Sequence, residues 1–333
     1  MKKKKIISYI LWSLPVLIAV VIFAIAGQSF QSEKGTTFGF TFSTLYAEEL
    51  GLDWQETFTA TLDDLGVRLY RIPVYWNRVE RERGEFDWYE IDWMLDEAAK
   101  RDAEVILAVG RRLPRWPECH DPIWLGEIES SEVFEQELFD YIDATIERYQ
   151  THDAIVAWQI ENEPFLGVFG ECPPLDEELL LKEIDFVQER VSLPIMITES
   201  GELSSWRHGA KIADIVGVSM YENTWNPFWG YFNYPLPPAF YHYKASHVEK
   251  AFPGTMVISS ELQTEPWTPV PMTSFPLNQQ FESIDLEKIQ QNVAFARDTG
   301  FDTVLMWGVE WWYWLKEVHN MPAIWEYGKT LFK

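Results

Sequence analysis

The sequence predicts an α/β fold in which eight parallel strands, alternating with helices, close into a (β/α)8 barrel behind one N-terminal transmembrane helix. Three observations support this. Apolar runs of strand length alternate with helical patterns along the chain. These runs are apolar almost throughout, as expected for strands that are buried on both faces. The roughly 300 residues after the N-terminal segment suit a barrel with a few long loops.

The first 26 residues are predicted to be a signal anchor. Four lysines open the chain, and residues 6–26 follow without a charge. At about 1.5 Å per residue, this run can span a bilayer as a helix. The lysines should stay in the cytoplasm, which makes the remainder extracytoplasmic and membrane-anchored. The alternative is a cleaved signal peptide before Gly27, which would make the protein secreted.

Residues 27–35 form a short polar linker, and residues 36–333 are expected to form a single barrel domain. Strands are predicted at 37–43, 67–75, 103–109, from 154 to the Asn-Glu-Pro tripeptide at 162–164, and at 194–198, 215–220, 255–260 and 303–307. Helices are predicted at 54–65, 89–101, 132–149, 176–191, 204–213, 240–251 and 286–299.

Local signals support these boundaries. Gly66 is a typical helix stop, and Asp176 is a suitable N-cap. Pro164 ends the fourth strand because proline cannot donate to a sheet ladder. An open doubly wound sheet is the alternative fold. The first strand is not followed by a glycine-rich phosphate loop, so nucleotide chemistry has no support.

Composition narrows the choice of partners. The net charge is −25, from 52 acidic and 27 basic side chains, which argues against nucleic acid, anionic membrane surfaces and acidic polymers. The 17 Trp, 14 Tyr and 21 Phe suit a surface that stacks on sugar rings, although most should be core. The six histidines show no metal-ligand spacing, so we expect neither a metal nor a cofactor. A monomer that acts on a neutral carbohydrate is expected.

Polar and aromatic residues gather where the strands end. The carboxyl ends of barrel strands share one face, and active sites lie there. Two glutamates on separate strands form the pair that a glycosidase needs. The strand-end residues are Arg71, Asn162, Glu163, Glu199, Tyr221, Glu261, Trp307, Glu310 and Trp311.

These motifs resemble the retaining glycoside hydrolases of clan A, a group of TIM-barrel enzymes that includes cellulases, β-mannanases and β-galactosidases. The resemblance rests on Asn162-Glu163-Pro164 at the fourth strand, Glu261 at the seventh, Arg71-Ile72-Pro73-Val74 at the second and Trp307 at the eighth. It covers essentially the whole barrel through a few short motifs.

The resemblance implies roles for these residues. Glu163 would be the general acid/base and Glu261 the nucleophile. Asn162 would hold the substrate 2-hydroxyl, and Arg71 would orient Glu261. Tyr221 would donate to Glu261. Trp307, Glu310 and Trp311 would line the sugar site.

Other acids compete for the catalytic roles. Glu161 shares the strand face of Glu163 but lies further from the strand end. Glu265 competes with Glu261 but lies further into its loop. Glu199, Glu202 and Glu222 are interpreted as rim charges or hydrogen-bond partners. The aromatic loop around residues 225–234 is interpreted as either a substrate platform or a packed lid.

Three alternative functions are consistent with these residues. The first is an endo-acting, cellulase- or mannanase-like enzyme that cleaves neutral β-linked hexose glycans. The second is an exo-acting, β-galactosidase-like enzyme, favoured by Pro114-Arg115-Trp116 and by the absence of the histidines that cellulases of the clan carry near the third and sixth strands. The third is a barrel that binds carbohydrate without catalysis.

The two cysteines lie in neighbouring loops. Cys119 follows the third strand and Cys172 follows the fourth. In an exported protein, such a pair predicts a disulfide that braces two loops of the active-site face. The alternative is two free thiols.

Overall fold

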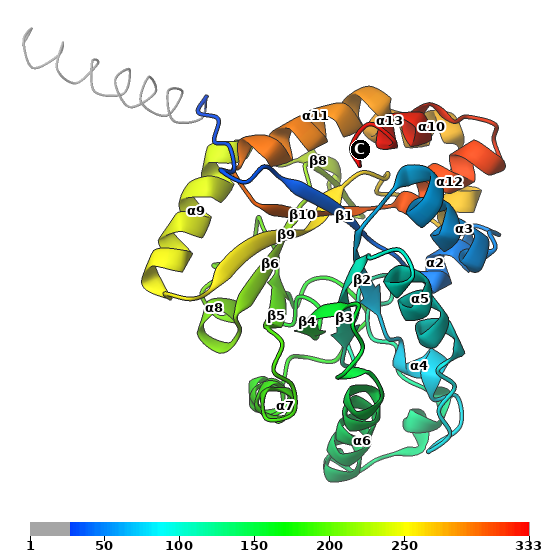
Figure 1. Cartoon of the computed structure of the whole chain (residues 1–333), viewed down its shortest axis with the longest axis vertical. Coiled ribbons are helices and arrows are strands. Elements are labelled where there is room, and N and C mark those ends of the chain that lie inside the picture. The colour runs from blue at the N-terminus through cyan, green and yellow to red at the C-terminus, as the bar shows by residue number, and fades with distance from the viewer. Residues whose placement is uncertain (1–26, 333) are drawn as a thin grey trace, which may run out of the picture.

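Eight parallel strands close into a barrel in the computed structural model, which describes residues 27–332 (Figure 1). The strands follow one another around it in the order β1-β10-β9-β6-β5-β4-β3-β2, and β2 pairs with β1 to complete the ring. The predicted (β/α)8 barrel is therefore confirmed. The barrel strands are β1 (Thr37–Thr41), β2 (Leu69–Pro73), β3 (Glu104–Val109), β4 (Ile155–Ile160), β5 (Ile195–Glu199), β6 (Ile215–Met220), β9 (Met256–Gln263) and β10 (Thr303–Trp307).

The predicted signal anchor, residues 1–26, lies outside the described residues. Within residues 27–332, no helix combines the length and the apolar character that a bilayer crossing requires. The predicted linker at 27–35 is held against the barrel. Phe30 donates its backbone N–H to the Asp298 carbonyl (2.9 Å), and its ring stacks on His242 with centroids 3.6 Å apart.

Helices surround the strands (Figure 1). The predicted helix at 54–65 is α3, which continues into one π-helical turn over 61–65 and ends at Gly66, whose φ of 82° is left-handed. Asp176 caps α7 as predicted, accepting from the N–H groups of Glu178 and Leu179. The helices are α2 (Thr44–Glu49), α3 (Trp54–Ala60), α4 (Trp76–Val79), α5 (Tyr89–Ala99), α6 (Ser131–Tyr149), α7 (Glu177–Gln188), α8 (Gly209–Ile212), α9 (Pro238–Ala251), α10 (Leu277–Ser283), α11 (Leu286–Asp298), α12 (Val309–Glu317) and α13 (Ala323–Gly328).

The prediction of a helix at 204–213 was largely wrong. Only the single turn of α8 forms there, because the preceding segment turns back on itself. Trp206, at a left-handed φ of 65°, donates its N–H to Glu199. Sequence patterns also missed a hairpin of two antiparallel strands, β7 (Asn223–Asn226) and β8 (Gly230–Asn233), inside the predicted aromatic loop.

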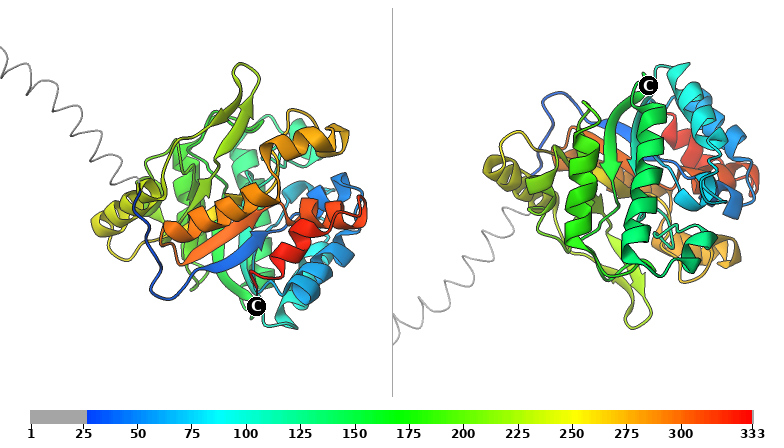
Figure 2. Two further views of the ribbon diagram at one scale, coloured as in Figure 1. Left: turned by 90° about the horizontal axis from the view of Figure 1, so that it is seen from above. Right: turned by 90° about the horizontal axis from the view of Figure 1, so that it is seen from below.

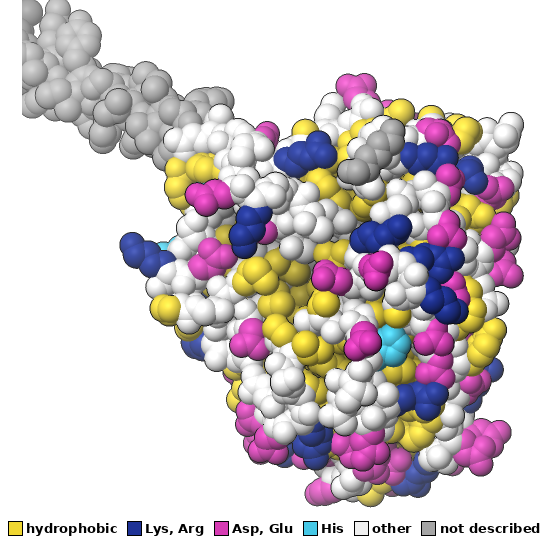
Figure 3. All heavy atoms as spheres, viewed as in Figure 1, with side chains coloured by type: hydrophobic (Ala, Val, Ile, Leu, Met, Phe, Trp, Pro, Cys, Tyr) yellow, Lys and Arg dark blue, Asp and Glu magenta, His cyan; other side chains and the backbone are white. Residues whose placement is uncertain are grey.

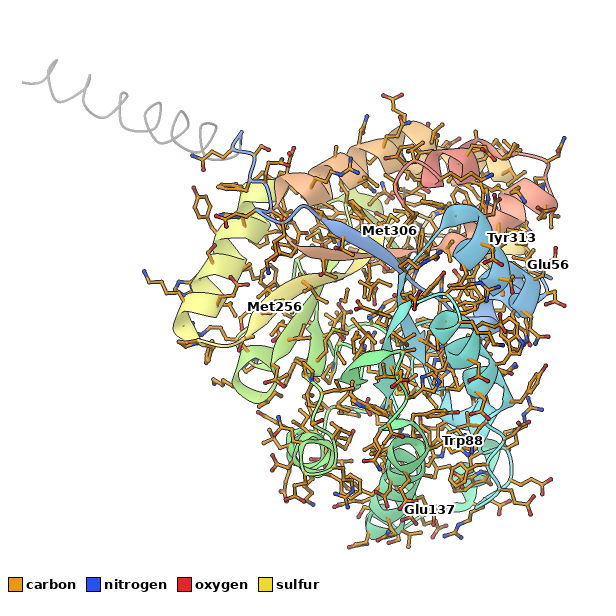
Figure 4. The ribbon with its side chains drawn as sticks, viewed as in Figure 1. Glu56, Trp88, Glu137, Met256, Met306 and Tyr313 are labelled. Carbon is orange, nitrogen blue, oxygen red and sulfur yellow. A yellow bond between two sulfur atoms is a disulfide. The ribbon has the colours of Figure 1, made fainter. Side chains whose placement is uncertain are left out.

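The core of the described residues has two main parts and a small third cluster of Tyr75, Ala108 and Leu113. One fills the barrel, and its members come from the strands themselves: Leu69, Ile106, Ala157, Met196, Ile215, Ile258 and Leu305. The other lies between strands and helices and includes Met306 of β10, which is labelled in Figure 4. Because side chains alternate along a strand, Leu305 points into the barrel while Met306 points outward.

The outer layer is tied together by polar contacts as well. Tyr313 of α12 donates its hydroxyl to Glu56 of α3 (2.9 Å), and both are labelled in Figure 4. On the face shown in Figure 3, Lys and Arg side chains lie among Asp and Glu side chains. Surface ion pairs such as Lys329–Asp64 (2.8 Å) are typical of this arrangement and contribute little stability individually.

Candidate active site

Strand alternation places two predicted site residues inside the barrel mouth. Leu69 fills the barrel interior, so Arg71, two residues later on β2, points inward nearer the carboxyl end. On β10, Leu305 fills the interior in the same way, so Trp307, two residues later, also points inward. The pattern is local and needs only the strand period.

Glu261 reaches the same interior through a bulge in β9. Val218 of β6 pairs with Ser259, whereas the next residue, Ser219, pairs with Glu261, so Ser260 is an extra residue without a register partner on β6. A bulge shifts the alternation by one position. It therefore brings Glu261 into line with the inward-facing residues.

The Glu261 carboxylate is held by two donors. Arg71 Nη2 donates to Oε1 (2.7 Å), and the Tyr221 hydroxyl donates to Oε2 (3.0 Å). Arg71 is fully buried and also donates Nε–H to Thr41 Oγ1 (2.8 Å). A buried guanidinium needs a charged partner, and its ion pair with Glu261 supplies one. The residues predicted to orient Glu261 thus contact it.

The two acids after β4 diverge. Both have left-handed φ angles, 56° at Glu161 and 41° at Glu163, so the chain turns sharply and strand alternation no longer applies. Glu161 accepts from the backbone N–H groups of Arg111 (2.6 Å) and Arg112 (2.7 Å) on the β3 side. Glu163 instead accepts from Ser219 Oγ (3.0 Å) on β6, whose Cα pairs with that of Glu261.

The surroundings of Glu163 favour its protonated form. The side chain is nearly buried, and its backbone N–H donates to Thr198 Oγ1 (2.8 Å). Burial, followed by the negative charges of Glu261 and Glu118, raises the pKa of Glu163 well above its usual range. Burial and nearby negative charge thus favour a proton on Glu163, whereas Glu261 is paired with Arg71.

Asn162 lies between these groups with its amide orientation set by neighbours. Its Oδ1 accepts from Thr198 Oγ1 (3.1 Å) and from Arg71 Nη1 (3.4 Å). Its Nδ2 donates to Glu118 Oε1 (3.3 Å). The second N–H of that amide remains to donate to a ligand.

Glu118 and Arg112 were missed by the sequence interpretation. Glu118 is buried, and burial raises its pKa to about 7. Arg112 Nε donates to Glu118 Oε2 (2.7 Å), while its two terminal nitrogens donate to the carbonyls of Leu166 and Phe169. The pair therefore joins the loop after β3 to the loop after β4. The only signal in the sequence was the position of Glu118 beside Cys119.

The predicted disulfide is confirmed. Cys119 and Cys172 are bonded, with their Cα atoms 5.3 Å apart. The bond links the same two loops as the Glu118–Arg112 pair. It therefore braces the segment that presents Glu118 to Asn162.

An ion cluster covers one side of Trp307. The Arg115 guanidinium lies 4.2 Å from the Trp307 ring and 3.7 Å from that of Tyr46, and it pairs with Glu265 and Glu310. Glu310 is fully buried and also accepts the Ser43 N–H (2.6 Å), and burial raises its pKa to about 7. The expectation that Glu310 lines the sugar site is corrected: it supports Arg115 from below the surface.

Trp311 also departs from expectation. It is fully buried in the core and donates its ring N–H to Gln280 (2.8 Å). Because it lies on α12 rather than at the strand end, it has no surface to offer a sugar. Glu202 accepts the Tyr221 N–H (2.9 Å) and is a partner rather than a member of the acid pair.

Part of the sequence matches a known protein family. Residues 51–172 match the model of a β-galactosidase family, glycoside hydrolase family 42. No curated protein matches the chain.

Several solved structures share the barrel. A β-galactosidase from the psychrophilic Marinomonas ef1 has 13% identity and a TM-score of 0.54, covering 81% of this chain and 54% of that one. An endo-β-1,4-xylanase of family 10 from Gloeophyllum trabeum has 14% identity and a TM-score of 0.57, covering 93% and 98%. A family 5 protein (GH5_18) from Streptomyces cattleya has 13% identity and a TM-score of 0.57, covering 84% and 71%.

At these identities, the solved structures establish a shared fold. The chain spans about half the length of the β-galactosidases that it matches, 54% and 52% of two of them. The family match over residues 51–172 and the barrel shared with the solved structures confirm the predicted resemblance to clan A glycoside hydrolases.

Proposed function

We propose that this glycoside hydrolase domain is a retaining enzyme that cleaves neutral β-linked hexose glycans by double displacement. The observation that carries the proposal is the contrast between two neighbouring acids. Glu261 is paired with Arg71 at 2.7 Å, whereas the pKa of Glu163 is raised by burial and by the charge of Glu261. A nucleophile must be ionised and a general acid protonated, so each acid suits one role.

In the first step, Glu261 attacks the anomeric carbon while the bond to the leaving oxygen breaks, and Glu163 transfers its proton to that oxygen. The product is a glycosyl ester on Glu261. In the second step, Glu163, now ionised, takes a proton from water, whose oxygen displaces Glu261 from the anomeric carbon. Both carboxyl groups return to their starting states, and the anomeric configuration is retained.

Asn162 binds the 2-hydroxyl of the reacting sugar through its remaining N–H. Its carbonyl oxygen is already engaged by Thr198 and Arg71 (3.1 and 3.4 Å), which supports this direction of donation. Hydrogen bonds to the 2-hydroxyl strengthen as the oxocarbenium-like transition state forms. Trp307 contributes an apolar wall next to Arg71, 5.8 Å from its ring centroid.

Endo action on a cellulose- or mannan-like chain is the first candidate for the cleavage mode, and exo action of the β-galactosidase type is the second. The match of residues 51–172 to a β-galactosidase family favours the second. So does the Arg115 cluster beside Trp307. β10, which ends at Trp307, stands directly across the barrel from β4, which precedes Glu163. If Glu163 protonates the leaving oxygen, the glycone lies on the opposite side of the scissile bond, toward Trp307 and Arg115.

A panel of 2-fluoro glycosides tests the mechanism. These compounds form the glycosyl ester and hydrolyse slowly, so peptide mapping should find the label on Glu261. Label on any other residue would refute the assignment. The member of the panel that reacts identifies the glycone. Product sizes from long β-glucans and β-mannans separate endo action, which gives mixed oligomers, from exo action, which releases one small sugar.

We also propose that residues 1–26 export the barrel and that residues 36–333 act as one monomeric, membrane-anchored domain. The Cys119–Cys172 disulfide supports export, because such bonds persist outside the reducing cytosol. Protease added to intact cells should digest the barrel if it lies outside. Light scattering of the full chain in detergent measures the oligomeric state.

A further inference from the structure

The hairpin formed by β7 and β8 carries aromatic side chains that the proposed mechanism does not use. It follows β6 and projects beyond the barrel, as both views in Figure 2 show. Residues 223–234 contain six aromatic side chains and no charged one, in a chain with a net charge of −25. The six are Trp225, Phe228, Trp229, Tyr231, Phe232 and Tyr234.

The aromatic side chains near the tip face solvent. Phe228 is 79% exposed, Trp229 is 76% exposed, and Phe232 is 47% exposed. The first two rings lie edge to face, with centroids 4.6 Å apart. Exposed apolar patches of this kind mark interaction sites. The tip therefore has the exposed apolar character of an interaction site.

The base of the hairpin is fixed to the strand that carries the candidate nucleophile. The Gln263 side-chain amide accepts the Asn223 N–H (3.0 Å) and donates to the Asn223 carbonyl (2.7 Å). Gln263 lies two residues after Glu261 on β9. A two-stranded ribbon is marginally stable alone, so this anchor gives the hairpin a defined position relative to Glu261.

An aromatic row connects the hairpin to the active site. The Tyr231 hydroxyl donates to the Trp267 carbonyl (3.0 Å). The Trp267 ring lies edge-on to Tyr221, with centroids 5.3 Å apart, and the Tyr221 hydroxyl donates to Glu261. On its other side, Trp267 contacts Phe169, with centroids 5.4 Å apart. Contacts between aromatic residues thus connect Tyr231 of the hairpin, through Trp267 and Tyr221, to Glu261.

We propose that the hairpin is a second carbohydrate-binding surface, which holds the part of a β-linked glycan chain that extends beyond the reacting sugar. The inference rests on the proposed function. Aromatic rings stack on the apolar faces of sugar rings, and asparagine amides such as those of Asn226 and Asn233 hydrogen-bond to hydroxyl groups. The absence of charge from 223–234 matches a neutral chain. An anionic membrane would be repelled by the acidity of the protein as a whole.

The test compares long and short substrates in the full chain. The double variant Phe228→Ala/Trp229→Ala removes the tip rings without touching the catalytic groups. We expect kcat/KM on β-linked gluco-, manno- or galacto-oligosaccharides of five or six units to fall about tenfold or more, because exposed aromatic anchors dominate binding surfaces. Activity on the aryl glycoside of the same sugar should change less than twofold. Ile123→Ala, at a side chain that is 96% exposed, is the matched control.

Equal losses on long and short substrates, or no loss on either, would overturn the inference. A wild-type dimer that dissociates in the double variant would instead identify a self-association surface, and co-sedimentation with zwitterionic vesicles that the variant loses would identify a membrane surface. Retardation in gels containing hydroxyethylcellulose, glucomannan or galactan measures glycan binding without hydrolysis. If no substrate is cleaved and no 2-fluoro glycoside reacts, the proposed function fails, whereas retardation that depends on Trp229 still supports the hairpin site.

Discussion

Replacing Glu163 by alanine should produce losses of activity that depend on the leaving group. The pKa of Glu163 is raised by burial and by the charges of Glu261 and Glu118, which favours the protonated form that a general acid needs. General acid catalysis by a positioned group is worth about 10²- to 10⁴-fold. Glycosides with alkyl or sugar leaving groups need that proton and should lose this factor in kcat/KM. A dinitrophenolate leaving group departs without a proton, so dinitrophenyl glycosides do not depend on the general acid. Their kcat/KM should stay within about threefold of the wild-type value.

The second step should slow for every substrate, because the variant also lacks the base that activates water. Glycosyl ester should therefore accumulate on Glu261 and be visible as a burst of dinitrophenolate and as added mass. Azide needs no base, so it should restore turnover and yield a β-glycosyl azide. The pH profile should change too. Wild-type kcat/KM should fall at high pH as Glu163 loses its proton, and the variant should lack this decline.

Glu161→Gln is the matched control. Glu161 lies two residues away, but its carboxylate accepts backbone N–H groups of Arg111 and Arg112 rather than facing Glu261. Any loss in this variant should be the same for all leaving groups and should not respond to azide. If Glu163→Ala loses activity equally on dinitrophenyl and alkyl glycosides, or keeps its alkaline decline, the reasoning from burial and charge to acid catalysis is wrong.

Three further predictions follow from the same contacts. Glu118→Ala should reduce kcat/KM about tenfold or more on substrates that carry a 2-hydroxyl, since a hydrogen bond to a charged group is worth about 1.5–3 kcal/mol. On 2-deoxy substrates the loss should be less than twofold. Equal losses on both would show that Glu118 does not act through Asn162. The double variant Cys119→Ser/Cys172→Ser lacks the cross-link that restricts the unfolded chain, so its free energy of unfolding should fall by about 4 kcal/mol in denaturant titrations. A loss below about 1 kcal/mol would contradict the explanation that the disulfide stabilises by lowering the entropy of the unfolded chain. Glu163→Gln should be more stable than the wild type, increasingly so as pH rises. A carboxyl whose pKa is raised on folding binds its proton more tightly in the folded state, so its contribution is greatest at low pH and is lost as pH rises through the folded pKa. Thermal unfolding between pH 4 and pH 9 that showed the opposite trend would reject the sign.

Strand period and turn residues were sufficient for the barrel and for part of the site. The inward direction of Arg71 and Trp307 follows from counting two residues beyond Leu69 and Leu305. The same counting from Ile258 would turn Glu261 outward, because it does not include the extra residue Ser260 that shifts the alternation. A bulge depends on pairing with both neighbouring strands, which the sequence of one strand does not reveal.

Residues assigned by proximity along the chain were less reliable. Glu310 and Trp311 follow β10 closely, but α12 begins at Val309 and turns both into buried positions. Conversely, Arg112 and Glu118 lie in the loop after β3, which ends at Val109, and were not recognised. The disulfide and the contacts of Arg112 with the β4 loop bring Glu118 back to Asn162.

The sequence by itself determined the (β/α)8 barrel, the strand ends at which polar residues gather, and the two cysteines that could pair, because these depend on hydrophobic period, turn chemistry and composition along short segments. Only the tertiary structure decided which acid is paired with arginine and which has its pKa raised by burial. Arg71 and Glu261 meet across 190 positions of sequence, and the state of Glu163 depends on how deeply it is buried and which charges lie near it. Desolvation and Coulomb interactions act through space, so neither can be evaluated until the chain has folded.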